Sequence, residues 1–361
     1  MAYYYFIVLL VLISALAKGS IFQTKIFGNF LTVIMLCLTV TIVIMNPLTI
    51  DMVRYIGVLE ENSTFTLFEA FTRVRWEPGF VFYQWIISKV SSSHIFFMAA
   101  TVLSILFITL KGLKKIVPQI YIPLIFIGYL SLFYYFNFLR NIIRQGFAVS
   151  FILLIIVFLA QEKTKQAVLY FFLAISFHIS AVISSLLFVV RKFNISIKLL
   201  CIFYIIGALT MLTGINQKIM SQFSMLIGGR IGSSIARYAS DSLITNYGSS
   251  NRIDFLLFTS FWLILGVCFY KYFLKKDYLY ESILKAYITF STIFVIFGYI
   301  GYSDRLAAYA WYLIPIIHFY PIIKMKGKYK ILWIFVLLGI CIGMFYFFDV
   351  SLLYQKLKLI Y

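Results

Sequence analysis

Long, nearly unbroken runs of apolar residues recur along the whole chain. Four of the clearest cover residues 27–45, 120–138, 255–269 and 331–348. Each approaches the ~20 residues that a helix needs to cross ~30 Å of hydrocarbon. Apolar residues fill consecutive positions instead of alternating, which excludes the pattern of a membrane β-barrel. The sequence therefore predicts an all-α, polytopic integral membrane protein with about ten to twelve transmembrane helices, built as one domain over residues 1–361.

Composition supports this fold class. Hydrophobic residues make up 63% of the 361 positions and aromatic residues 20%, well above the apolar fraction of roughly half in soluble domains. Residues 2–18 fit a first transmembrane helix better than a cleaved signal peptide, because no positive region precedes them. The four cysteines lie inside apolar runs without the spacing of a metal site or disulfide. We therefore expect no metal and no cofactor.

The formal charge of +19 does not indicate nucleic acid, because the basic residues are scattered between the hydrophobic segments. Cytoplasmic loops of membrane proteins accumulate lysine and arginine, so these charges predict orientation instead. If the lysine-rich loops lie inside, the outer segments are residues 47–78, 140–145, 214–254 and 303–305. The first and third are too long to be simple connectors, and we expect these two outer loops to carry function.

One apolar run leaves the topology open. Residues 168–190 separate two basic loops that both favour the cytoplasm, at 163–165 and 191–192. A re-entrant pair of half-helices, bent near residues 176–180, keeps both ends inside and places His178 deep in the protein. The alternative is a single ordinary span, in which case one of the two basic loops lies outside and departs from the positive-inside rule.

Arginine and lysine segregate along the chain in a way that the positive-inside rule does not require. Arginine grips phosphate or carboxylate with a planar fork of donors, whereas lysine is a hydrated point charge. An outer cluster of arginines therefore indicates an anionic ligand, although any single one is more often a solvated loop charge or a headgroup anchor. The arginines in or beside outer segments are Arg54, Arg73, Arg75, Arg140, Arg144, Arg230, Arg237, Arg252 and Arg305.

Arg140 and Arg144 are the strongest candidates, because they join two apolar helices and stand four apart, on one face of a continuous helix. His178 lies in an apolar run between serines, where an imidazole serves as a base, a hydrogen-bond donor or a core residue. Asp304 lies next to Arg305, and a salt bridge is its default role.

Three short motifs occur in order: residues 77–80 (Glu-Pro-Gly-Phe), residues 144–148 (Arg-Gln-Gly-Phe-Ala) and residues 177–181 (Phe-His-Ile-Ser-Ala). Together they resemble the signature of EpsG-type and Wzy-type polysaccharide polymerases, in which an Arg-Gln-x-x-Ala helix start precedes a Phe-His-x-Ser-Ala element. The match covers about a third of the chain.

The resemblance implies a nucleotide-sugar-independent glycosyltransferase that polymerises undecaprenyl-diphosphate-linked repeat units of O-antigen, capsule or exopolysaccharide. It would act at the outer face of the bacterial plasma membrane. Its partners would be the lipid-linked oligosaccharide and membrane lipid, with a chain-length regulator as a further candidate and no nucleic acid. His178 and Arg144 are then the expected catalytic residues. The expected substrate-binding residues are Arg140, Gln145, Arg230, Arg237, Arg252, Asp304 and Arg305.

Two other classes fit the same features. A flippase or transporter of lipid-linked oligosaccharide also combines many helices with basic residues, but such proteins typically show internal repeats and midplane charges. An O-antigen ligase uses the same lipid-linked donor and passes the glycan to a lipid core, and these residues do not separate it from a polymerase.

Overall fold

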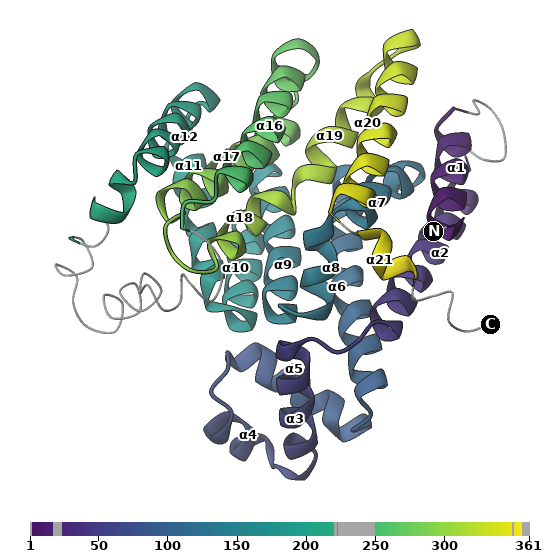
Figure 1. The fold of residues 1–361 in the computed structure, drawn as a ribbon, viewed down its shortest axis with the longest axis vertical. Helices are drawn as coiled ribbons and strands as arrows, with labels where there is room; N and C mark the ends of the chain where they lie inside the picture. Colours follow the sequence, from purple (N-terminus) through teal and green to yellow (C-terminus); the bar gives the residue numbers. More distant parts are fainter. Residues whose placement is uncertain (1, 17–23, 220–221, 223–249, 349, 356–361) are drawn as a thin grey trace. The chain divides into compact units, whose positions relative to one another are not determined.

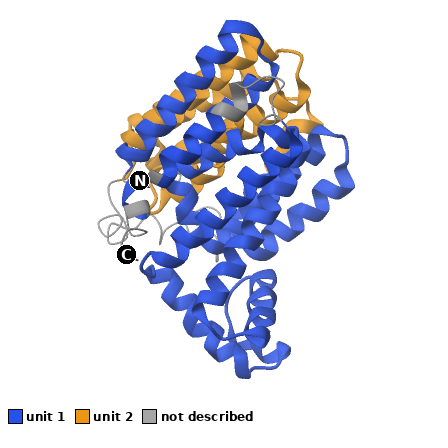
Figure 2. Ribbon diagram, turned by 90° about the vertical axis from the view of Figure 1, so that its right-hand side faces the viewer, with its two compact units in different colours: residues 1–184, 318–361 blue, residues 185–317 orange. Residues whose placement is uncertain are grey.

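The structure, a computed structural model, describes residues 2–16, 24–219, 222, 250–348 and 350–355. These residues form helices and their connections and contain no strand, which confirms the all-α prediction. Contacts divide the chain into two compact units, residues 1–184 with 318–361, and residues 185–317 (Figure 2).

The described residues hold seven helices that are long and apolar enough to cross a membrane. A further pair, residues 119–131 and 133–140, passes the same test together but bends by 85°. The described residues also contain three apolar helices of 10–17 residues, which are too short for this test, so the count of ten to twelve transmembrane helices stays a prediction. The chain is therefore a multi-pass membrane protein.

The first unit is built around α9 (Ile143–Ala160), a helix of 18 residues whose side chains are almost all buried. Such a helix is apolar on every side because neighbours surround it. The other helices of this unit are α1 (Ala2–Leu16), α2 (Lys25–Met45), α3 (Ile50–Thr64), α4 (Leu67–Arg73), α5 (Pro78–Val90), α6 (His94–Ile116), α7 (Ile122–Ser131), α8 (Phe133–Arg140), α10 (Thr164–Phe177), α20 (Gly327–Phe347) and α21 (Val350–Gln355), with 3-10 turns at Gln119–Tyr121 (η2) and Ile179–Ser184 (η3).

Helix α6 runs parallel to α9, and α10 returns antiparallel beside it. The Thr109 hydroxyl on α6 lies 3.1 Å from that of Ser150 on α9, while Phe147 near the start of α9 and Phe177 at the end of α10 pack with ring centres 4.6 Å apart. The lysines therefore collect at one end of this bundle, where Lys111 donates to Tyr170 over 2.9 Å. Arg144, on the first turn of α9, lies at the opposite end.

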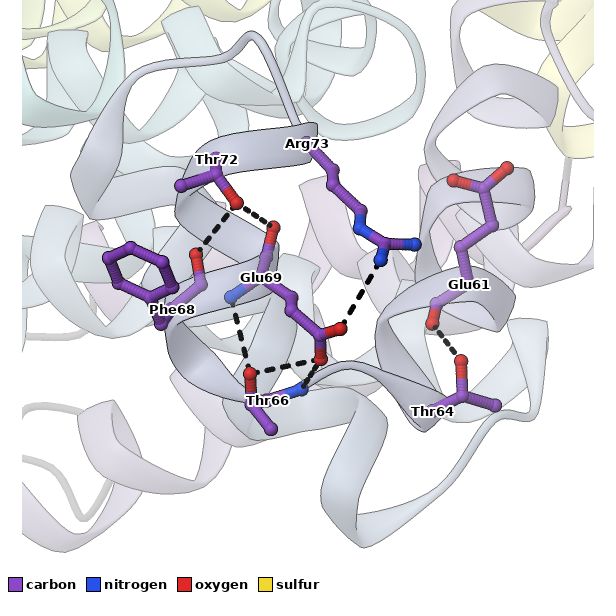
Figure 3. Close-up of polar contacts among 7 residues, drawn as sticks. All are labelled: Glu61, Thr64, Thr66, Phe68, Glu69, Thr72 and Arg73. Atoms are coloured by element: carbon purple, nitrogen blue, oxygen red, sulfur yellow. Dashed lines mark hydrogen bonds and ion pairs between the residues drawn. The ribbon is translucent and has the colours of Figure 1, made fainter.

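Residues 50–90 form a small helical lobe, with α3, α4 and α5 below the other labelled helices of the first unit in Figure 1. We expected residues 47–78 to be a long loop, but they fold into two short helices. Thr66 starts α4 with a capping box, in which its side chain and that of Glu69 satisfy each other's backbone N–H groups (Figure 3). Ala70, Val74 and Val81 form the core of the lobe.

The second unit contains α11 (Ser185–Lys192), α12 (Ile197–Leu212), α16 (Ile253–Phe269), a π-helical turn at Tyr270–Leu274 (η4), α17 (Tyr278–Ile296) and α18 (Ser303–Trp311). The first part of α19 (Ile314–Lys324) belongs to it as well. An apolar groove of about 430 Å³ lies between α11, α12 and α17, lined mainly by leucine, isoleucine and valine. Thr210 and Asn216 are among its few polar lining residues.

Candidate functional site

Three segments that are far apart in the sequence meet at the arginine end of the first unit. They are the start of α5, the start of α9 and the connection from α10 to η3. Each carries one polar side chain of interest, respectively Glu77, Arg144 and His178. These segments are the three motifs singled out in the sequence, so the fold brings all three into one site.

Arg144 is held on several sides. Its Nη1 donates to Oε2 of Glu77 over 2.6 Å, and its Nε donates to the hydroxyl of Tyr55 over 3.3 Å. The guanidinium carbon also lies 5.5 Å from the ring centre of Trp76 and 5.9 Å from that of Tyr55, within cation–π range. With 24% of its side chain exposed, Arg144 is fixed in orientation yet still open to solvent.

Glu77 is the N-cap residue of α5, and Pro78 follows at the first helical position. An N-cap side chain ordinarily accepts from its own helix, but Glu77 makes no such bond. Its Oε1 instead accepts the backbone N–H of Ile179 over 3.0 Å. Burial by itself raises the pKa of Glu77, but Arg144, His178 and the Ile179 N–H together hold it below its usual value. Glu77 is therefore an anion at rest.

His178 lies at a break in the chain. Helix α10 ends at Phe177, His178 is extended (φ −157°, ψ 121°), and η3 begins at Ile179. The backbone N–H of Ser180 donates to Nδ1 of His178 over 3.2 Å, and the Ser180 hydroxyl lies 2.6 Å from the same nitrogen. The break falls where the hairpin hypothesis places its bend, while the direction of the two arms through a membrane stays a prediction. His178 is half-buried, and not fully enclosed as that hypothesis expects.

A glycine allows α5 and α10 to approach each other. A Cβ at Gly79 would lie 2.8 Å from the carbonyl oxygen of Ser176, and closer still to its hydroxyl. Tyr83, one turn further along α5, packs on Phe147 of α9 with ring centres 4.9 Å apart. Close backbone approach and aromatic packing thus hold Glu77 against the end of α10.

Arg140 does not share a helical face with Arg144, so this part of the sequence prediction is wrong. Helix α8 ends at Arg140 and α9 starts at Ile143, because Asn141 and Ile142 leave helical geometry. The break lets the last turn of α8 fold onto α9, where the Phe138 carbonyl contacts Gly146 so closely that a Cβ there would clash. Arg140 is directed to the chain before α3, donating from Nη2 to the Pro47 carbonyl over 3.1 Å.

Gln145 is 1% exposed and packs inside the first unit. It lies directly after Arg144 on the first turn of α9, so a supporting role at this site suits it better than direct contact with a large ligand.

The second unit contains a separate polar group. The side chain of Arg252 donates from Nε to Asp254 over 2.7 Å and lies 4.0 Å from the ring centre of Phe255. The Asp254 hydrogen bond raises the pKa of Arg252, and the nearby charge of Asp304 contributes as well. Arg305 lies over the ring of Tyr302 at 4.2 Å. Arg252, Asp304 and Arg305 are therefore neighbours, whereas Arg230 and Arg237 lie outside the described residues.

Two residues of the lobe have roles that sequence reasoning missed. Glu77 belongs to the first motif but has no arginine close to it in sequence beyond Arg75, and it was not among the expected site residues. Its signal was an acidic side chain directly before a helix-starting proline. Lys89, near the end of α5, is the second. Its Nζ donates to the carbonyls of Asn62, Ser63 and Phe65 over 2.8–3.2 Å, so it satisfies the end of α3.

The chemistry available at the first site is that of a guanidinium, a carboxylate and an imidazole in a partly enclosed place. A guanidinium with a planar fork of donors suits a phosphate or carboxylate group. Within the described ranges, no three His, Cys, Asp or Glu side chains gather in a group that could hold a metal ion.

No curated protein and no solved structure matches the chain. The sequence profile of the EpsG family matches residues 29–359, a range that contains all three motif segments and both units almost entirely. The match supports a polysaccharide-polymerase-like role in general terms. With this length of agreement, and with the three motif segments meeting at one site, the chain belongs to the EpsG family.

Proposed function

We propose that this protein polymerises lipid-linked oligosaccharide repeat units by glycosyl transfer at the outer face of the bacterial plasma membrane. The observation that carries the proposal is the half-buried Arg144, held by Glu77 and Tyr55 at the meeting point of the three motif segments. The donor would be a growing glycan on undecaprenyl diphosphate, and the acceptor a hydroxyl of a second lipid-linked unit.

In the proposed reaction, the acceptor oxygen attacks the anomeric carbon as the bond between that carbon and the diphosphate oxygen breaks. The diphosphate leaves with the bonding electron pair, and the acceptor hydroxyl gives up its proton. Arg144 would stabilise the developing negative charge on the leaving group, because a preorganised cation in a partly desolvated site acts most strongly there. We propose that His178 acts in the same reaction centre and that Arg140 contributes to substrate binding beside it.

Two further features support a lipid-linked substrate. The arginine end of the first unit lies at the end of a helix long enough to span a membrane, which is the depth at which a lipid diphosphate would present its charge. The second unit, taken by itself, contains an apolar groove with an aliphatic lining of the kind that a lipid tail needs. In that unit, Arg252, Asp304 and Arg305 are proposed to contact the substrate, as are Arg230 and Arg237, whereas Gln145 is proposed to support the substrate site from inside the first unit.

The test is the size distribution of the surface glycan in a deletion strain complemented at matched expression. Wild type should restore long chains, whereas Arg144→Ala and His178→Ala should leave single repeat units. Arg54→Ala is the matched control, because Arg54 lies in the lobe of residues 50–90, is 72% exposed and pairs only with nearby Asp51 among the contacts seen. Long chains in the deletion strain, or loss of even the single unit, would contradict the proposal and favour a ligase, flippase or modifying enzyme.

A further inference from the structure

Glu77 occupies the position of an anionic ligand. Its two carboxylate oxygens accept from the Arg144 guanidinium at 2.6 Å and from the Ile179 N–H at 3.0 Å. A guanidinium combined with a backbone N–H at a chain break is a donor set that also binds phosphate. Only 14% of the Glu77 side chain is exposed. The protein's own carboxylate therefore fills the place that we assign to the substrate's diphosphate.

Both anions compete for one guanidinium. A diphosphate carries more charge than a carboxylate, so its arrival at Arg144 would displace Glu77 from that partner. The burial that raises the pKa of Glu77 would remain, whereas the neighbouring cation that lowers it would be neutralised. Glu77 would then become a stronger base at the moment when the donor is in place.

The alternative base, His178, is engaged at its basic nitrogen. A backbone N–H can only donate, so the bond from Ser180 N to Nδ1 assigns the lone pair to Nδ1. A neutral imidazole then carries its proton on Nε2 and can only donate there. The titratable groups around Glu77 are Arg144 and His178, and Tyr55 is the titratable group on α3 that contacts Arg144. Among these, Glu77 is the group suited to accept a proton.

We propose that Glu77 is the general base of the transfer reaction and that Arg144 holds it inactive until the donor diphosphate takes the guanidinium. This inference rests on the proposed function. In the step itself, the O–H bond of the acceptor breaks and its proton moves to Glu77. The acceptor oxygen bonds to the anomeric carbon, the bond from that carbon to the diphosphate breaks, and the protonated Glu77 later releases its proton to solvent.

The experiment compares the full-length protein in lipid nanodiscs as wild type, Glu77→Gln, Arg144→Ala and Glu69→Gln. Binding of undecaprenyl diphosphate and the rate of repeat-unit transfer are both measured. Glu77→Gln should bind the diphosphate roughly tenfold more tightly, because a competing internal anion is gone. Its turnover should fall by about 10²-fold or more, the usual contribution of a base. Glu69→Gln is the control, since Glu69 lies in the same lobe but pairs with Arg73 and Thr66.

The outcomes separate this inference from the proposed function. If Arg144→Ala loses binding and Glu77→Gln also binds more weakly, Glu77 only orients Arg144 and the inference is overturned, while the diphosphate site stands. Unchanged turnover in Glu77→Gln overturns it as well. Equal binding by wild type and Arg144→Ala removes the diphosphate site itself. Glu77→Asp keeps a carboxylate and serves as the second variant if Glu77→Gln does not fold. Partial turnover by Glu77→Asp supports the inference. A folded Glu77→Asp protein without turnover opposes it.

Discussion

Arg144 and Glu77 form an ion pair of 2.6 Å although they stand 67 positions apart in the chain. The pair ties the first turn of α9, a helix buried in the first unit, to the first turn of α5 in the lobe. Because Glu77 also accepts the Ile179 N–H, the same carboxylate reaches the break after α10. Three separate segments therefore depend on one acidic side chain for their alignment.

Arg144→Lys should lower transfer activity by about 10- to 100-fold, although the charge is kept. Lysine cannot bind Glu77 and Tyr55 together or offer a planar fork to a phosphate, and the loss of one such donor typically costs this much or more. The rate of repeat-unit transfer by purified protein measures the effect. Arg73→Lys is the control, because Arg73 is 60% exposed and pairs with Glu69 at the lobe surface. Equal activity of Arg144→Lys and wild type would show that charge alone suffices.

Gly79→Ala should destabilise the protein by about 1–3 kcal/mol, as overpacking of a close contact does. The added Cβ would meet the Ser176 backbone and push α5 away from α10, so activity should fall too. Gly57→Ala offers a matched comparison on α3, where a Cβ meets nothing within 4 Å. That change should be neutral or stabilise by up to about 1 kcal/mol, because alanine favours helix. Thermal unfolding in detergent distinguishes the two, and equal stability would contradict the close approach.

Lys89→Met should loosen the lobe at residues 50–90. The Lys89 ammonium donates to three carbonyls at the end of α3, and hydrogen bonds that involve a charged group contribute about 1.5–3 kcal/mol, less at an exposed site. Faster proteolysis within the lobe is the expected result. Lys165→Met, an exposed lysine at the start of α10, should leave the cleavage rate unchanged.

The Glu77 pair also predicts a dependence of stability on pH. The folded state lowers the pKa of Glu77 below its ordinary value of about 4.3, so the folded protein binds fewer protons there than the unfolded chain. The contribution of Glu77 to stability is thus present above that value and is lost as the pH falls through the lowered pKa. Wild type should exceed Glu77→Gln in unfolding temperature near pH 7, and the difference should shrink below about pH 4. A constant difference across this range would show that the carboxylate charge contributes nothing.

Hydrophobic pattern and motif order predicted the fold class and the family and singled out all three meeting segments, but only Arg144 and His178 among their polar residues were expected to be catalytic. The helix start at Arg144 was implied only by the resemblance, and the break near His178 was one of two alternatives that the sequence left open. The convergence of Glu77 with them is a long-range packing result, and no spacing in the sequence reports it. Local signals that were overlooked include the Thr66 and Glu69 capping box, which marks a helix within the supposed loop.

The prediction that Arg140 and Arg144 share one helical face was wrong for a related reason. Asn141 and Ile142 do not break a helix by propensity strongly enough to be recognised, and the contact of the Phe138 carbonyl with Gly146 that accompanies the break depends on packing between α8 and α9. The expected outer loop at residues 214–254 lies mostly outside the described residues, so its role stays a prediction.

Helix α9 has 18 residues between the arginine site and the lysine-bearing turn at Lys163, a rise of about 27 Å at 1.5 Å per residue. That length is close to the ~30 Å of a bilayer's hydrocarbon core, so the length of α9 sets the depth of Arg144 in the membrane. In a bilayer whose hydrocarbon core is markedly thicker than the length of α9, the guanidinium would lie within hydrocarbon. Local thinning of the bilayer would have to compensate. Transfer should therefore depend on the acyl-chain length of the surrounding lipid, as a matter of hydrophobic matching and not of lipid charge.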